Sequence, residues 1–142
     1  MDPNTRSIRV VRTNNIYAIP EAASAGRIRP WRIALVLKRL QLKFIIDLIA
    51  PCAIGRFDVE SKVYPEIDLG PFLAEEYGVS RRHLIIQLEN DSVVVIDNDS
   101  SNGTTLNGEL LQAGRAYPVR HADELVLGAM ELQVELLTNP LD

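Results

Sequence analysis

The sequence of 142 residues contains a single cysteine, Cys52, and only two histidines, His83 and His121. One cysteine excludes an internal disulfide and fits a reducing compartment. The sequence has no Cys/His spacing typical of a metal site and no Gly-x-x-x-x-Gly-Lys-Ser/Thr phosphate loop. It also offers no nucleophile–base pair with an obvious orienting group. We therefore expect a non-enzymatic protein that holds neither a metal nor a cofactor.

The sequence also lacks an apolar run long enough to cross a membrane. The most apolar window, residues 33–50, is interrupted by Lys38, Arg39, Lys43 and Asp47, and charges at those positions argue against a membrane span. The first residues do not follow the order of a signal peptide, which is a charged start, an apolar stretch and a small-residue cleavage site. The sequence therefore predicts a cytoplasmic protein with no membrane partner.

The formal net charge of −4 is distributed unevenly along the chain. Residues 1–43 contain nine of the fifteen lysines and arginines and only two acids, whereas residues 44–142 contain six basic and seventeen acidic residues. We expect a basic, flexible or loosely docked N-terminal arm over residues 1–38, one domain over residues 39–138 and a short tail over residues 139–142. The lone tryptophan, Trp31, is a candidate for docking the arm onto the domain.

The domain consists of short strand-like segments separated by turn residues. Apolar and polar residues alternate from Arg39 to Asp47, which favours a half-buried strand over a helix through the same residues. Asn90-Asp91, Asn107-Gly108 and Gly128-Ala129 each separate two strand-like runs and predict hairpins. Residues 71–77 predict one helical turn that ends at a glycine. About ten short strands with almost no helix predict an all-β sandwich, whose loops gather at its ends.

Three loop segments carry residue types suited to binding an anion. They are Gly55-Arg56, Ser80-Arg81-Arg82-His83 and Ser100-Ser101-Asn102-Gly103-Thr104. Arginine presents a planar fork of donors that suits phosphate, serine adds hydroxyl donors, and an amide such as that of Asn102 can bind the backbone of an extended peptide. Each segment alone also fits an ordinary turn or solvated loop. Their order and spacing in one β-rich chain favour recognition of a phosphorylated peptide.

This combination resembles the forkhead-associated (FHA) domain family over about residues 40–137. The resemblance implies a β-sandwich of about eleven strands that binds phosphothreonine peptides through loops at one end. It implies phosphate contacts from Arg56, Ser80, Arg81 and Ser101, and a hydrogen bond from Asn102 to the peptide backbone. The residues implied to support the site from beneath or to shape its scaffold are Gly55, His83, Gly103, Asn107 and Gly108. The phosphothreonine would be produced by an upstream Ser/Thr protein kinase, and the type of protein would be a small bacterial FHA protein.

The basic arm leaves an alternative function open. It fits a solubilising tail that lies against its own acidic domain, contact with nucleic acid or another anionic partner, or a regulatory segment in which Thr5 or Thr13 is phosphorylated. Nucleic acid is disfavoured because Tyr17 and Trp31 are the only aromatic residues available for stacking. The alternative to phosphopeptide binding is an FHA-type interaction protein that acts through another surface or through this arm.

Overall fold

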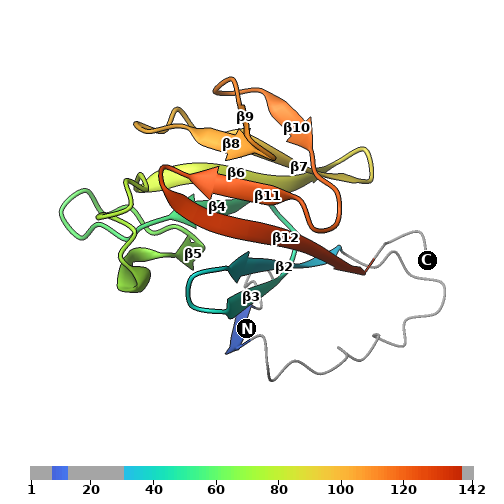
Figure 1. Ribbon diagram of the computed structural model, residues 1–142, viewed down its shortest axis with the longest axis horizontal. Coiled ribbons are helices and arrows are strands. Elements are labelled where there is room, and N and C mark those ends of the chain that lie inside the picture. Colours follow the sequence, from blue (N-terminus) through green and yellow to red (C-terminus); the bar gives the residue numbers. More distant parts are fainter. Residues whose placement is uncertain (1–7, 13–30, 139–142) are drawn as a thin grey trace.

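The computed structural model describes residues 8–12 and 31–138, which form two β-sheets packed face to face (Figure 1). The first sheet has the strand order β1-β3-β2-β12-β11-β8-β9, and the second has the order β10-β7-β6-β4-β5. Neighbouring strands are antiparallel except for the short parallel pair β4 and β5. The strands are β1 (Ile8–Arg12), β2 (Arg32–Leu37), β3 (Leu42–Asp47), β4 (Cys52–Gly55), β5 (Ile67–Asp68), β6 (Arg82–Glu89), β7 (Ser92–Asp97), β8 (Thr104–Leu106), β9 (Glu109–Leu110), β10 (Ala116–Pro118), β11 (Glu124–Leu127) and β12 (Met130–Thr138). The prediction of an all-β sandwich is confirmed.

The core lies between the two sheets and consists almost entirely of aliphatic side chains. The first sheet contributes alternate residues of β2, Ile33, Leu35 and Leu37, and the second contributes Ile54 of β4 and Ile86 of β6. Alternation places every second side chain of a strand on the inner face, and burial of that face drives the two sheets together. Cys52 of β4 is buried in the same cluster, as expected of a small apolar residue.

The hairpins form at the turn residues that the sequence offers. Asn90 and Asp91 join β6 to β7 with φ angles of 50° and 64°, and Asn107 and Gly108 join β8 to β9 with φ angles of 50° and 87°. Both central residues of a two-residue hairpin turn of this type need positive φ, which asparagine, aspartate and glycine tolerate best. These turns fix the register of the strands that lead to the loops at the two ends of the sandwich.

The prediction that the basic arm extends to residue 38 is wrong, because β2 is a central strand of the first sheet. β2 pairs with β3 on one side and with β12 on the other, and residues 33–37 are buried. Residues 8–12 form β1, which pairs with β3 at the edge of the same sheet. Trp31 directly precedes β2 and is buried, and its indole Nε1 donates to the carbonyl oxygen of Asp91 at 3.2 Å. The remainder of the expected arm and the tail at 139–142 lie outside the described residues.

The helical turn expected at residues 71–77 is a 3₁₀ turn over Gly70–Phe72, followed by further turns up to Gly78. Leu73 then adopts a left-handed conformation with a φ of 67°. This segment leads directly into Val79 and the second of the three loop segments. In the described part of the chain, no helix has the length and apolar character needed to cross a membrane.

Candidate functional site

Three loops meet at the end of the sandwich that lies to the left in Figure 1: the loop after β4, the loop before β6 and the loop between β7 and β8. The first two are joined through Gly55. A Cβ atom at Gly55 would lie 2.0 Å from the carbonyl oxygen of Arg81, far inside van der Waals contact. The Arg56 N–H donates to that same oxygen at 3.1 Å. Glycine is therefore required where the backbone of the second loop crosses the end of β4.

Arg56 is held beside Ser80 by its own guanidinium group. Its Nε donates to the carbonyl oxygen of Val79 at 2.8 Å, and its side chain is half-buried. Among contacts within the described part of the chain, this is the one hydrogen bond of the guanidinium. The two terminal nitrogens of Arg56 therefore remain available to an anion while the planar group is already oriented.

Ser80 and Ser101 link the second loop to the third. The Ser101 N–H donates to Ser80 Oγ at 3.0 Å. Because the Ser80 oxygen acts as the acceptor in this contact, its own hydroxyl hydrogen remains free to point toward a ligand. The Ser101 side chain is exposed at the same edge. The structure thus brings Arg56, Ser80 and Ser101 together, although they come from three separate parts of the sequence.

His83 lies beneath these residues and is fully buried. Its Nδ1 accepts a hydrogen bond from the Ser80 N–H at 3.0 Å, and its Nε2 lies 2.9 Å from the carbonyl oxygen of Gly103. The two partners require a neutral ring that carries its proton on Nε2. Burial lowers the pKa of His83, against the opposing effects of the Gly103 carbonyl and the Asp97 carboxylate. One neutral imidazole therefore connects the second and third loops from below.

Asn102 is exposed and is oriented by the second loop. Its Nδ2 donates to the carbonyl oxygen of Gly78 at 2.9 Å. This bond fixes the plane of the amide and leaves the Asn102 carbonyl oxygen turned away from Gly78. An amide held in this way can exchange hydrogen bonds with the backbone of an extended peptide.

Asp97 is a supporting residue that the sequence analysis missed. Its buried carboxylate accepts hydrogen bonds from the Ser100 N–H at 3.1 Å, from Ser100 Oγ at 2.6 Å and from Thr104 Oγ1 at 2.6 Å. Burial alone would raise the pKa of Asp97, but these hydrogen bonds outweigh it, and the pKa is lowered. Asp97 thereby fixes both ends of the loop that presents Ser101 and Asn102. The available signal was an acid at the end of an apolar strand, followed three residues later by a serine.

Gly128, between β11 and β12, was predicted as a hairpin turn, but its contact with the site was not. A Cβ atom there would lie 2.6 Å from the carbonyl oxygen of Tyr77 and 2.7 Å from that of Gly78. The Gly128 N–H donates to the Gly103 carbonyl oxygen at 3.0 Å, and the Ala129 N–H donates to that of Tyr77 at 2.8 Å. The β11–β12 hairpin therefore packs directly under the second and third loops.

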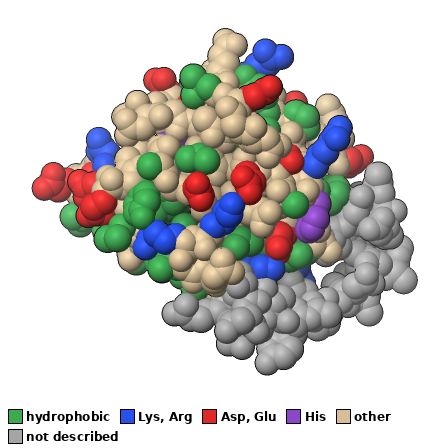
Figure 2. All heavy atoms as spheres, viewed as in Figure 1, with side chains coloured by type: hydrophobic (Ala, Val, Ile, Leu, Met, Phe, Trp, Pro, Cys, Tyr) green, Lys and Arg blue, Asp and Glu red, His purple; other side chains and the backbone are tan. Residues whose placement is uncertain are grey.

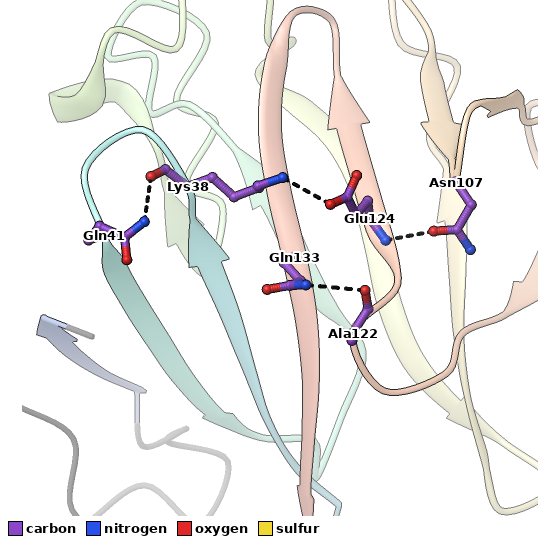
Figure 3. A network of polar contacts seen from close by, with 6 residues as sticks. All are labelled: Lys38, Gln41, Asn107, Ala122, Glu124 and Gln133. Carbon is purple, nitrogen blue, oxygen red and sulfur yellow. Dashed lines mark hydrogen bonds and ion pairs between the residues drawn. The ribbon is translucent and has the colours of Figure 1, made fainter. Parts of the chain in front are cut away.

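Asn107 and Gly108 lie at the opposite end of β8 from Gly103. Asn107 Nδ2 donates to Asp123 Oδ1 at 3.0 Å, and Asn107 Oδ1 accepts from the Glu124 N–H at 2.8 Å. Figure 3 shows the hydrogen bond between the Glu124 N–H and Asn107, beside the ion pair between Lys38 and Glu124 on the first sheet. Asn107 and Gly108 therefore shape the β8–β9 hairpin, and Asn107 also contacts β11. Any support they give the three loops passes through strand β8.

The two arginines of the second loop, Arg81 and Arg82, differ in their surroundings. Arg81 is exposed, and its Nη1 lies 3.2 Å from Asp58 Oδ2 in the loop after β4. Arg82 is exposed and begins β6, next to the buried His83. The structure therefore places Arg81 at the junction of the first and second loops with a carboxylate already bound to it.

A hollow of about 330 Å³ adjoins Arg56 on the side of the 70–76 segment. Its walls are formed by Arg56, Phe57, Asp68, Gly70, Pro71, Glu75 and Glu76. Three carboxylates on these walls disfavour an anion inside the hollow. The donors suited to a phosphate are therefore those between Arg56 and Ser101. Within the described residues, no group of three His, Cys, Asp or Glu side chains gathers as a metal site would require.

Comparison with known proteins identifies relatives for more than half of the chain. The sequence model of the FHA domain matches residues 53–128. Protein FraH of Nostoc sp. is 37% identical over 71 residues, which are 50% of this chain and 24% of FraH. Angiogenic factor with G patch and FHA domains 1 of Mus musculus is 31% identical over 99 residues, which are 66% of this chain and 13% of that protein. The chain thus spans a quarter or less of the length of these curated relatives.

A solved structure is also similar in fold. It comes from a structural and functional study of phosphothreonine-dependent FHA domain interactions. It superimposes with a TM-score of 0.58 and 26% sequence identity, and the match covers 73% of this chain and 95% of that one.

Proposed function

The chain belongs to the FHA domain family, and from this premise we propose that it is a phosphothreonine-peptide-binding module. The observation that carries the proposal is the convergence of an oriented arginine, two serines and an oriented amide at one end of the sandwich. The Ser101 N–H to Ser80 Oγ bond of 3.0 Å and the Arg56 Nε to Val79 bond of 2.8 Å hold these groups together. Such preorganised donors lower the entropic cost of binding an anion.

In the proposed complex, the phosphate receives hydrogen bonds from Arg56, Ser80, Arg81 and Ser101. At neutral pH the phosphate carries a charge of about −1.5 to −2 and three strong acceptor oxygens, which match these donors. Asn102 binds the backbone of the peptide next to the phosphothreonine. Gly55, His83 and Gly103 hold the loops in place from beneath, and Asn107 and Gly108 act at a distance through β8.

The proposed biological role is recruitment of, or response to, proteins phosphorylated on threonine. The phosphothreonine must come from an upstream Ser/Thr protein kinase. FHA domains are binding modules, and we propose that this chain acts without catalysis, in the cytoplasm of a bacterial cell. The sequence similarity to FraH of Nostoc sp. supports the bacterial assignment.

The experiment that tests the proposal is a calorimetric titration of the full chain with an oriented library of phosphothreonine peptides. Matched phosphoserine and unphosphorylated peptides serve as controls. We expect selective binding of phosphothreonine peptides and no measurable binding of the unphosphorylated ones. Equal binding of phosphorylated and unphosphorylated peptides by the folded protein would refute the proposal and favour another surface as the interaction site.

A further inference from the structure

The guanidinium of Arg81 is already paired with a carboxylate of the same chain. Arg81 Nη1 lies 3.2 Å from Asp58 Oδ2, and the side chains are 50% and 25% exposed, respectively. An exposed pair of this kind contributes little to stability. It does, however, place a carboxylate on a guanidinium that the proposed phosphate site uses. An anionic ligand that approaches Arg81 from the Nη1 side competes with Asp58.

Asp58 is held in place independently of Arg81. Its Oδ2 accepts hydrogen bonds from the Ser61 N–H at 3.1 Å and from the Ser61 hydroxyl. Its backbone forms two hydrogen bonds with Val63, each of 3.1 Å, which close a small ribbon. The preceding Phe57 N–H donates to Asp68 Oδ1 at 2.8 Å. The carboxylate of Asp58 is therefore a fixed group, and Arg81, on a long flexible side chain, is the partner that can move.

Asp58 faces the charges of both arginines that are expected to bind phosphate. Hydrogen bonds from the Ser61 side chain and backbone lower the pKa of Asp58, and the positive charges of Arg81 and Arg56 lower it further. The carboxylate is thus ionised at neutral pH. In Figure 2 acidic and hydrophobic side chains lie side by side at the left end of the molecule, where the loop after β4 projects in Figure 1.

We infer that Asp58 is an internal competitor, a carboxylate that occupies Arg81 in the free protein and thereby sets the affinity of the site for its ligand. The inference rests on the proposed function and extends it to the strength of binding. A phosphate close to the dianion, with three acceptor oxygens, offers Arg81 more than Asp58 does, so it can take over the guanidinium. The negative charge of Asp58 opposes the approach of that phosphate. Asp58 therefore keeps the affinity of the site below the value that Arg81 alone would give.

The test uses three peptides that differ at one position, which is phosphothreonine, glutamate or threonine. Each is titrated against the full wild-type chain and against Asp58→Asn and Glu60→Gln. Glu60 is an exposed acid in the same loop, so Glu60→Gln removes the same charge without touching Arg81. Asparagine at position 58 keeps an oxygen that can accept from the Ser61 N–H. Thermal unfolding of both variants shows whether the fold is retained.

We expect Asp58→Asn to strengthen binding of the phosphothreonine peptide by about twofold to fivefold, and to strengthen binding of the glutamate peptide by no more than that, because the phosphate carries the larger charge. Glu60→Gln should strengthen binding of the phosphothreonine peptide by a smaller factor, because it removes the same charge without freeing Arg81. An Asp58→Asn variant that strengthens phosphothreonine binding no more than Glu60→Gln does would overturn the inference. A variant that loses affinity for the phosphothreonine peptide would also overturn it and would assign Asp58 to positioning Arg81.

Failure of the proposed function has a different signature in the same experiment. The comparison of phosphothreonine and threonine peptides on the wild-type chain tests that function before any variant is used. If the wild-type chain does not prefer the phosphothreonine peptide, phosphopeptide binding itself is refuted and the inference about Asp58 falls with it. If it does prefer that peptide, the two variants decide on Asp58 alone.

Discussion

Gly55 and Arg56 are neighbours with different roles at the site: Gly55 leaves space for a backbone carbonyl, and Arg56 presents its guanidinium. The missing side chain of Gly55 lets the carbonyl of Arg81 approach the end of β4, and the Arg56 N–H then binds that carbonyl. The guanidinium of Arg56 is aligned by Val79 on the same segment. The orientation of the arginine thus depends on a glycine whose own contribution is only the space it leaves.

Replacing Arg56 by alanine should weaken phosphothreonine-peptide binding by roughly 10- to 150-fold. A hydrogen bond to a charged group is worth about 1.5–3 kcal/mol, and about 1.4 kcal/mol corresponds to a factor of ten. The measurement is calorimetry with the best peptide of the library. Arg120→Ala is the matched control, because Arg120 is exposed and follows β10, away from the three loops. An Arg56→Ala variant that binds as tightly as the Arg120→Ala control would contradict the assigned role.

At the scale of elements, the β2–β3 hairpin braces the segment that leads into the second loop. Arg39, in the turn of this hairpin, donates from Nη2 to the Phe72 carbonyl oxygen at 2.7 Å. Its guanidinium also lies 5.0 Å from the centre of the Tyr77 ring. Since Gly78 and Val79 bind Asn102 and Arg56, this hairpin holds the carbonyl groups that orient two site residues.

We therefore expect Arg39→Ala to increase amide hydrogen exchange at Tyr77, Gly78 and Val79. The cation–π contact alone is worth about 0.5–1 kcal/mol at an exposed position, so an increase of roughly two- to fivefold follows from its loss. Lys38→Ala is the control, because Lys38 pairs with Glu124 on the first sheet. Exchange rates at these three amides that match those of the control would show that the hairpin does not brace the segment.

The sequence allowed accurate prediction of elements whose signals are local. Asn90-Asp91 and Asn107-Gly108 adopt the positive φ angles that these residue pairs favour, and the alternating pattern located β3 to within a few residues. β2 was missed because residues 33–37 form a continuous apolar run with no alternation. Such a run arises where both faces of a strand are covered, as residues 33–37 are in the first sheet.

The sequence predicted which residues form the candidate site, but it did not predict the contacts that support them. The three loop segments were found because arginine, serine and asparagine have known uses at phosphate sites. Asp97 was missed although its partners Ser100 and Thr104 lie close to it in the sequence. Gly128 was predicted only as a hairpin turn and Asp58 was not singled out, because their roles at the site depend on partners distant in sequence. Gly128 packs against the backbone of Tyr77, and Asp58 pairs with Arg81, which lies 23 residues further along the chain. Tertiary contacts of this kind leave no periodic or compositional trace.

At the scale of the whole molecule, two buried titratable residues beneath the site, His83 and Asp97, make the free energy of unfolding depend on pH. Burial lowers the pKa of His83 below its ordinary value of 6.5, so protons favour the unfolded chain, and stability is lost as the pH falls from about 6.5 toward the folded-state value. The pKa of Asp97 is lowered from 3.8, so the stability contributed by Asp97 is present above that pH and is lost only below it. As the pH falls, the loss of stability caused by His83 therefore begins at a higher pH than the loss caused by Asp97.

We expect the free energy of unfolding to fall between pH 7 and pH 5, and we expect His83→Gln to remove part of this fall. The free energy of unfolding is measured at each pH by urea unfolding, followed by the fluorescence of Trp31, because that side chain is buried in the folded protein. His121→Gln, a substitution at an exposed histidine, serves as the control. Identical pH dependence in the wild type and His83→Gln would show that the buried imidazole does not cause the effect.

The measurement that tests the central claim most directly is a nuclear magnetic resonance titration of the full chain with a phosphothreonine peptide and its unphosphorylated twin. We predict that the phosphorylated peptide alone shifts backbone amides, and that the largest shifts fall at residues 56–58, 78–82 and 101–103. The Ser101 amide, which donates to Ser80 Oγ, should be among the most affected. Shifts of equal size with both peptides, or shifts concentrated at the opposite end around residues 48–51 and 90–91, would contradict a phosphate site on the three loops.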